Sequence, residues 1–363
     1  MNQQAQDGLL RGIQYLRFVA ALMVVLAHAW QMVPIVGEGG SLVGPSFPGG
    51  AAGVDLFFVI SGFIMVYITS QRPVGPGQFM LDRAARIAPP YWLITLLMAA
   101  VLMVAPGVFR SASFDIATLI TSLLFIPWPS TAVPGTAPLL QIGWTLNYEM
   151  LFYAIFALAM LIAREHRIVI AAGAILALVS MQLFIPNDSN DFFQFYSSTI
   201  MIEFVFGMAI ALVLQRYPVS PRLVAAALPV ALAIWLYSLS FDVGRLSQTR
   251  FLIWGLPAAL VVASIAALDL RSTVPLNRTL LLLGNASYAI YLTHLFALGA
   301  VRKVWPMMPA MVQQSDVLLL LSAALLALAV GVGFYLYVER PLVKLAKSAA
   351  HRLARARIAA IAS

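Results

Sequence analysis

The stretch VLLLLSAALLALAVGVGFYLYV, residues 317–338, decides the fold class of this chain. It runs for 22 residues without a charged side chain, and about 20 apolar residues are enough for a helix to cross the hydrocarbon core of a bilayer. Further apolar stretches precede it, separated by proline, glycine and charged residues, so the sequence predicts about ten transmembrane helices. These stretches are residues 13–35, 51–70, 87–105, 144–163, 168–186, 196–214, 223–240, 251–268 and 280–301.

The composition leads to the same class. Of 363 residues, 62% are hydrophobic and 10% are charged, whereas about 25% are charged in an average soluble domain. So little polar surface cannot cover so large an apolar interior. A water-soluble enzyme, a disordered chain and a collagen-like fibre are therefore excluded, and we expect an all-α integral membrane protein. The chain has no cysteine, which excludes disulfides and thiolate metal sites, and we expect no metal.

Positive charge predicts the topology. A net charge of +8 can indicate nucleic-acid binding in a soluble protein, but in a membrane protein it fits the positive-inside rule better. We therefore expect no nucleic-acid partner. Ten spans with both termini in the cytoplasm put sixteen Lys and Arg side chains inside and five outside. Counting the short stretch 114–127 as a span would largely remove this bias, so a re-entrant or interfacial helix is expected there. The five outer charges are Arg110, Arg245, Arg250, Arg302 and Lys303.

The two ends of the chain complete the predicted organisation. The first apolar stretch carries Arg17 and is expected to remain as a span rather than to be cleaved as a signal peptide. Residues 1–338 are expected to form a single transmembrane domain. The basic, alanine-rich segment 339–363 is expected to be a cytoplasmic tail, solvated or lying on the inner membrane surface.

Ionisable side chains within apolar helices are costly and are usually functional. On a helix, the eleven residues from Arg17 to His28 make three turns plus about 20°, so both side chains share one face, about 16 Å apart along the axis. The topology places five of the six such side chains toward the outer face, and Arg17 below them with Arg83 and Arg86. The six are Arg17, His28, Asp55, Glu149, Glu203 and His294.

Each of these residues also has a structural interpretation. Arg17 could extend to the inner interface as long basic side chains do, and a lone histidine such as His28 could be a neutral packing residue. Asp55 stands where it could cap a helix start. Glu203 and His294 could make hydrogen bonds between helices. Both interpretations stay open at this point.

Six blocks of sequence, in order, resemble motifs of membrane acyltransferase family 3. Together they extend from residue 13 to residue 341, which is nearly the whole chain. The fourth block most resembles the exopolysaccharide-production branch. The blocks are IQYLR followed after ten residues by His28 (13–28), GVDLFFVISGF (53–63), RAARIAPPYW (83–92), WTLNYEMLFY (144–153), LGNASYAIYLTH (283–294) and VERP (338–341).

The resemblance implies transfer of an acyl group, usually acetyl, across the bacterial inner membrane. The donor would be cytoplasmic acetyl-CoA or another short acyl-CoA, and the acceptor a carbohydrate hydroxyl of an exopolysaccharide or lipid-linked glycan at the outer face. Membrane lipid and polysaccharide-synthesis machinery would be its partners. The membrane domain would act without the extracytoplasmic esterase-like domain that some relatives carry.

Roles for the donor and the catalytic residues follow from the resemblance together with the predicted depths. Arg17, Arg83 and Arg86 would bind the phosphates of CoA, although the last two could be ordinary inner-surface charges. His28 would be the general base of a direct transfer, or a nucleophile that carries the acyl group. Asp55 or Glu149 would orient its ring, and the sequence does not choose between them.

The remaining candidates concern the acceptor. Trp144 and Tyr148 would stack on a sugar ring or, alternatively, belong to an interfacial aromatic belt. Glu203 and His294 would contact the acceptor. The main rival function is a transporter or flippase for a glycan or small acid with a His and carboxylate proton relay, and an inactive scaffold is a third. The sequence shows neither the internal repeat nor the matched broken helices common in transporters.

Overall fold

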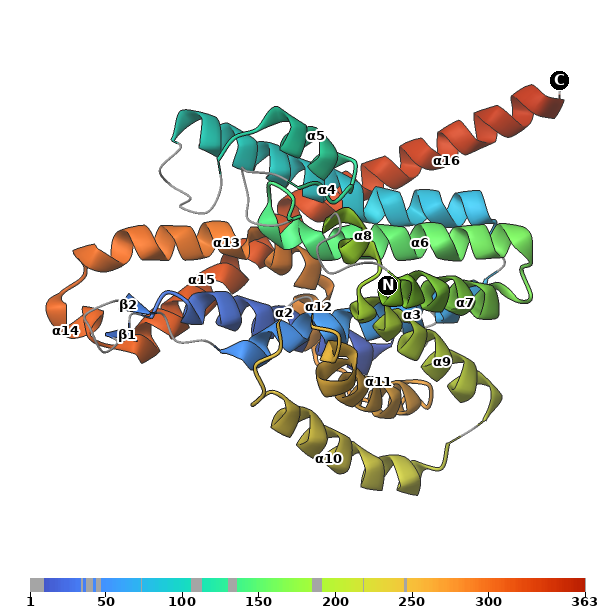
Figure 1. The fold of residues 1–363 in the computed structure, drawn as a ribbon, viewed down its shortest axis with the longest axis horizontal. Helices are drawn as coiled ribbons and strands as arrows, with labels where there is room; N and C mark the ends of the chain where they lie inside the picture. The colour runs from blue at the N-terminus through green and yellow to red at the C-terminus, as the bar shows by residue number, and fades with distance from the viewer. Residues whose placement is uncertain are drawn as a thin grey trace. The chain divides into compact units, whose positions relative to one another are not determined.

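The computed structural model describes residues 10–33, 35–36, 42–43, 47–72, 74–105, 113–129, 136–184, 191–217, 219–244 and 247–362. Helices make up nearly all of the regular structure in these ranges (Figure 1). The strands described are β1 (Ile35–Val36) and β2 (Leu42–Val43), which pair antiparallel over two residues each. The predicted all-α class is confirmed.

Eight helices of the described chain are long and apolar enough to cross a membrane. A ninth span is the pair Arg278–Asn285 and Ser287–Met307 if its 70° bend is counted within one crossing. The predicted stretch 168–186 corresponds to a shorter apolar helix, Arg167–Leu183. The eight helices are Arg11–Trp30, Gly49–Gln71, Pro76–Val104, Gln141–Ile162, Phe192–Arg216, Pro221–Ser238, Phe251–Asp269 and Asp316–Arg352.

Two helices extend beyond the apolar stretches that predicted them. The span expected at 87–105 begins instead at Pro76, and its helix continues through Pro89 and Pro90. The last span continues past residue 338 as one helical run to Arg352. Hydropathy marks where a helix is apolar, whereas backbone hydrogen bonds decide where it ends, so polar turns are missed. The sidedness of the termini stays a prediction, and two of the outer charges, Arg110 and Arg245, lie outside the described residues.

The chain forms two compact units, which are described separately. Unit 1 comprises Met1–Met65 and Glu203–Tyr335. Its elements include most of α3 and of α9, and a 3₁₀ turn (Pro48–Ala51) leads into α3. The helices are α2 (Arg11–Trp30), α3 (Ala52–Gln71), α9 (Ile202–Arg216), α10 (Pro221–Ser238), α11 (Leu256–Asp269), α12 (Arg278–Asn285), α13 (Ser287–Val304), α14 (Ala310–Gln313) and α15 (Asp316–Phe334).

Small residues let the helices of unit 1 approach closely. A Cβ added at Gly62 of α3 would lie 3.0 Å from the Cα of Phe204, and one at Gly207 of α9 would lie 2.6 Å from the nitrogen of Phe63. The α3 and α9 backbones therefore touch at a pair of glycines, as small residues allow in membrane proteins. Helices α2, α13 and α15 share an apolar core that includes Val25 and Ile290.

The start of α2 is held by a residue distant in sequence. The Asp269 carboxylate, at the end of α11, accepts the backbone N–H groups of Gly12 and Ile13, each at 2.8 Å. These N–H groups belong to the first turn, which has no partner within its own helix, and the anion also suits the positive end of the helix dipole. Tyr15 adds a hydrogen bond from its hydroxyl to Pro275 O at 2.9 Å. The position of α2 is thereby fixed.

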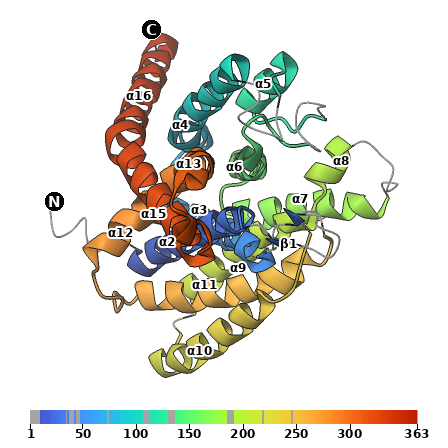
Figure 2. The same ribbon diagram turned by 90° about the vertical axis from the view of Figure 1, so that its left-hand side faces the viewer.

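Unit 2 comprises Val66–Ile202 and Leu336–Ser363. Helix α4 packs against α5, α6 and α16 within it (Figures 1 and 2). Helix α5 is the short helix expected near 114–127, and the Asp115 side chain caps its start by accepting from Thr118 N at 2.7 Å. The helices are α4 (Pro76–Val104), α5 (Ile116–Leu123), α6 (Trp144–Ile162), α7 (Arg167–Ser180), α8 (Asp191–Tyr196) and α16 (Arg340–Ala362).

Large apolar side chains also face outward from the helices. Leu161 is 70% exposed and Leu325 is 65% exposed. Such exposure along whole helices is unfavourable in water but is what a surface in contact with lipid requires. Together with the lengths of the helices, it makes this a multi-pass membrane protein.

Candidate active site

Helix α2 carries two of the predicted site residues. It is unbroken from Arg11 to Trp30, so the predicted spacing of Arg17 and His28 along one face holds. Arg17 Nη1 donates to Gln14 Oε1 at 3.2 Å. His28 is partly buried near the other end of the helix, and its Nδ1 lies 2.9 Å from Val24 O.

The structure brings His28 and His294 together. Their ring centroids are 5.0 Å apart with the planes tilted by 53°. Helix α13 presents His294, which is fully buried, and its Nδ1 lies 2.6 Å from Tyr291 O. The His294 Nε2 atom is buried and makes no hydrogen bond within the described part of the chain.

Backbone carbonyls fix the tautomer of both rings. A carbonyl oxygen only accepts hydrogen bonds, so Nδ1 must carry the proton in each neutral imidazole. The Nε2 atoms of His28 and His294 are then the basic nitrogens, each with a lone pair. We expected a carboxylate to orient His28, but its hydrogen bond among the described residues goes to Val24 of its own helix.

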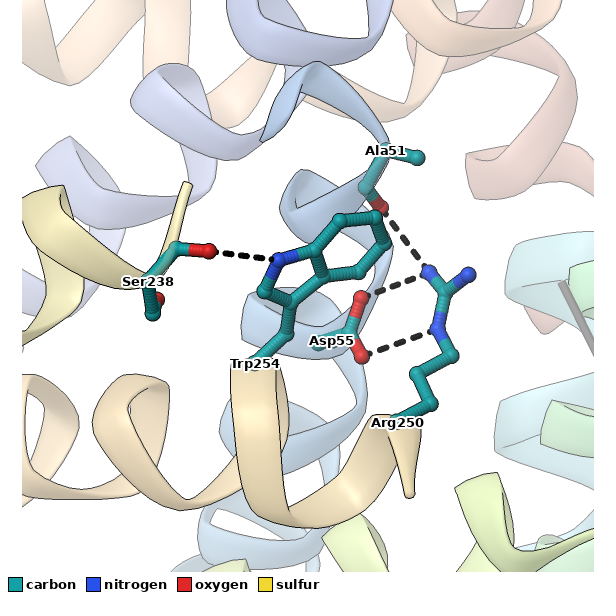
Figure 3. Close-up of polar contacts among 5 residues, drawn as sticks. All are labelled: Ala51, Asp55, Ser238, Arg250 and Trp254. Atoms are coloured by element: carbon teal, nitrogen blue, oxygen red, sulfur yellow. Dashed lines mark hydrogen bonds and ion pairs between the residues drawn. The ribbon is translucent and has the colours of Figure 1, made fainter. Parts of the chain in front are cut away.

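A buried ion pair forms the second polar group of unit 1 (Figure 3). Arg250 donates from Nε to Asp55 Oδ1 at 3.0 Å and from Nη2 to Asp55 Oδ2 at 2.6 Å. The side chains are 2% and 0% exposed. Nη2 also donates to Ala51 O at 3.1 Å. A bidentate pair with a further acceptor satisfies both charges in the apolar interior.

The surroundings of Arg250 complete its burial. Its guanidinium carbon lies 4.8 Å from the centroid of the Trp254 ring, a cation–π contact. The indole Nε1 of Trp254 donates to Ser238 O at 3.0 Å, as Figure 3 shows. Arg250 was expected among the outer charges without a partner, whereas the structure buries it against Asp55; its side of the membrane stays a prediction. The sequence held one signal: a carboxylate in an apolar helix requires a cation.

Glu203 lies in the same cluster. It is fully buried in the first turn of α9 and interacts electrostatically with both Asp55 and Arg250. Its side chain covers Gly255, where an added Cβ would meet Glu203 Cγ at 2.8 Å. Asp55 and Glu203 are therefore grouped around Arg250, and Asp55 directs both carboxylate oxygens to that side chain.

In unit 2, Glu149 and Arg83 interact electrostatically. The Tyr153 hydroxyl donates to the Glu149 carboxylate, and Arg83 interacts electrostatically with both Tyr153 and Glu149. We expected Arg83 at the inner rim and Glu149 toward the outer face, and these two levels stay a prediction. Helix α4 begins at Pro76, so Arg83 lies two turns inside the helix instead of at its end.

Other side chains of the protein cover part of the two aromatic candidates on α6. Trp144 meets Tyr148 edge to face at 5.9 Å. Tyr148 is fully buried, its ring stacks on Phe195 of α8 at 4.1 Å, and its hydroxyl donates to Phe195 O at 2.6 Å. The face of Tyr148 proposed for sugar stacking is thus covered by α8, whereas Trp144 remains partly exposed.

One polar residue of the same helix escaped the sequence analysis. Asn147 is 1% exposed, and neither polar atom of its side-chain amide has a hydrogen-bond partner in the described chain. An amide left unsatisfied in a buried position is costly. The signal available was its place within the block WTLNYEMLFY, two residues before Glu149.

The fold is that of a multi-pass membrane protein, and its buried ionisable side chains are of the types that enzymes use. A family model described as an acyltransferase domain matches residues 10–337. The chain therefore belongs to this acyltransferase family and is an O-acyltransferase, as its motifs predicted.

Several curated proteins are similar to the chain. The exopolysaccharide production protein ExoZ of Rhizobium meliloti (strain 1021) is 36% identical over 301 residues, covering 83% of this chain and 92% of that protein. The acyltransferase MdmB of Streptomyces mycarofaciens is 26% identical, covering 77% and 76%. Nodulation protein 10 of Rhizobium leguminosarum bv. viciae is 26% identical, covering 84% and 89%. No solved structure matches the chain.

Proposed function

We propose that the protein transfers an acyl group, acetyl in particular, from cytoplasmic acyl-CoA to a carbohydrate hydroxyl. The acceptor is an exopolysaccharide or a lipid-linked glycan at the outer face of the bacterial inner membrane. Similarity to a protein named for exopolysaccharide production supports the acceptor class. Membership of the acyltransferase family supports an activated acyl donor.

The observation that carries the proposal is the tautomer of His28. Because Nδ1 is bound to Val24 O, the lone pair lies on Nε2, and imidazole is suited to accept a proton near neutral pH. His294 offers a second such nitrogen, buried and without a partner among the described residues. One nitrogen can take the reacting proton while the other accepts a hydrogen bond from the acceptor.

In direct transfer, His28 Nε2 removes the proton from the acceptor hydroxyl as its oxygen bonds to the thioester carbonyl carbon. The C–S bond then breaks, and the CoA thiolate leaves with the proton that the imidazolium returns. In the alternative route, Nε2 itself attacks the carbonyl, CoA leaves, and the acyl-imidazole later passes its acyl group to the hydroxyl. The second route gives ping-pong kinetics. We favour direct transfer.

The donor and acceptor need different residues. Arg83 and Arg86 of α4, with Arg17 of α2, are the proposed partners of the CoA phosphates, which planar guanidinium groups bind well. Trp144 is the aromatic side chain that retains exposed surface for a sugar. Glu149 is held by Tyr153 and is the proposed carboxylate of the catalytic machinery.

Oriented inner-membrane vesicles test this proposal. Acetyl-CoA labelled on the acetyl group is supplied at the cytoplasmic face, and label is measured on glycan or lipid-linked sugar. His28→Ala is compared with His166→Ala, since His166 is an exposed histidine. We expect label to be lost in His28→Ala alone. Equal label in both variants would remove His28 from the chemistry, and no label from the unaltered protein with several acyl-CoA donors would overturn the proposal.

A further inference from the structure

The C-terminal helix α16 lies along α4 in unit 2 (Figures 1 and 2). The sequence predicts a basic cytoplasmic tail for this segment. Its position beside α4 places the basic residues of α16 next to that helix. His351 Nε2 lies 3.1 Å from Asp82 Oδ1, which joins the two helices. Gln78 of α4 donates to the same oxygen at 3.0 Å.

One helical turn before His351, Lys347 faces the same part of α4. It is partly buried and interacts electrostatically with Arg83, Arg86 and Asp82. Arg83 and Arg86 also interact with each other. Lys347 of α16 thus lies within electrostatic reach of Arg83 and Arg86 of α4, some 260 positions earlier in the sequence, on two helices that pack together.

In the described chain no salt bridge joins these three cations to an acidic side chain, although Asp82 and Glu149 attract Arg83 at longer range. Asp82 makes its hydrogen bonds to Gln78 and His351 instead. The Nε atom of Arg83 is buried and also lacks a hydrogen-bond partner among the described residues. Like charges held together in partly buried positions repel one another, and an anion between them removes this cost.

We propose that Arg83, Arg86 and Lys347 form one phosphate-binding site, with α16 supplying its third cation. This inference rests on the proposed function, since the expected ligand is the phosphate-bearing nucleotide of acyl-CoA. Arginine binds phosphate oxygens in a bidentate manner, and lysine adds a compact charge. The headgroup of an anionic phospholipid offers the same chemistry, so the experiment separates the two sources.

Binding to the purified full-length protein in nanodiscs of neutral phosphatidylcholine tests the site. Acetyl-CoA and acetyl-(3′-dephospho)-CoA are titrated against the unaltered protein, Lys347→Gln and Lys344→Gln. Lys344 is a matched control because it lies on the same helix and is exposed. We expect Lys347→Gln to raise the Kd for acetyl-CoA about tenfold, and Lys344→Gln to change it less than about twofold. The 3′-dephospho donor shows whether the affected contact is to the 3′-phosphate.

The melting temperature separates a binding role from a structural one. Removing one of three repelling cations should leave the ligand-free Tm of Lys347→Gln unchanged or higher. A lower Tm together with an unchanged Kd would overturn the inference. Equal Kd values for the two variants, with tight binding by the unaltered protein, would also overturn it while leaving the proposed donor intact.

A second arm uses nanodiscs that contain phosphatidylglycerol. If that lipid raises the Tm of the unaltered protein but not of Lys347→Gln, and acetyl-CoA binds none of the proteins, the phosphate site stands and the proposed donor falls. If neither ligand distinguishes Lys347→Gln from Lys344→Gln, the site itself is rejected.

Discussion

Two buried polar groups of unit 1 use their hydrogen-bonding capacity in opposite ways. The Asp55–Arg250 pair directs both carboxylate oxygens to the guanidinium, which donates once more to Ala51 O. In the described chain, each ring of the histidine pair is bound through Nδ1 to a carbonyl of its own helix, and the buried Nε2 of His294 has no hydrogen-bond partner there. The two groups thus differ in role: the satisfied ion pair holds the fold, whereas the histidine Nε2 lone pairs are the proposed contacts to substrate.

The sharpest test of this comparison is removal of His28. We expect His28→Ala to lower the rate of acyl transfer by about 10²–10⁴-fold, because it removes the proposed base. The Tm in detergent should change little, since the ring is partly exposed and bound only to its own helix. Normal transfer by a folded His28→Ala protein would place the chemistry elsewhere.

Breaking the Asp55–Arg250 ion pair should instead lower the stability of the protein. Asp55→Leu or Arg250→Leu leaves a buried charge without its partner, which costs about 3–5 kcal/mol of stability. The double variant should recover most of that loss, because two apolar side chains replace two charges. Thermal unfolding of the four proteins checks this. Additive losses in the double variant would show that the pair contributes no coupling.

Replacing His294 should lower the rate of acyl transfer less than replacing His28. We expect His294→Leu to lower transfer about tenfold, since it removes a hydrogen-bond acceptor for the substrate. Its Nε2 is buried without a partner in the described chain, so the apolar variant should melt at the same or a higher temperature. A large fall in Tm would instead make His294 a structural residue.

Asn147 extends the comparison to unit 2 with the smallest effect. Leucine has the same branched side-chain skeleton, although its methyl groups are larger, and it removes two buried polar atoms that lack partners among the described residues. We therefore expect Asn147→Leu to stabilise the protein by about 1 kcal/mol and to lower transfer less than tenfold. If Asn147→Leu lowered the stability and left the transfer rate unchanged, the Asn147 amide would be a structural group and not one that binds substrate.

The sequence was sufficient for the class of protein and for local geometry. Apolar length predicted the spans, and the regular pitch of a helix predicted that Arg17 and His28 share a face. It was insufficient wherever a partner comes from far along the chain. Arg250 lies 195 positions from Asp55, and hydropathy made it a loop charge. Phe195 covers Tyr148 in the same way, which no local pattern reveals.

Helix ends were the other source of error. Helix α4 starts at Pro76, well before the apolar stretch that predicted it, so Arg83 lies inside the helix instead of at its start. Polar turns that prolong an apolar helix have no hydropathy signal, so depth estimates from hydropathy were unreliable at these positions. The pairing of His28 with His294 was suggested only as a shared level. Their 5.0 Å approach depends on packing between α2 and α13.

The Asp269 cap of α2 has a consequence for how the protein is made. The helix that carries His28 is synthesised well before α11, since the carboxylate that caps its start lies 257 residues later than Gly12. During synthesis, the backbone N–H groups of the first turn of α2 therefore lack this acceptor until α11 has been inserted. Nascent chains released before residue 269 should insert α2 without this cap, so the helix that carries His28 completes its hydrogen bonds only after α11 has been made.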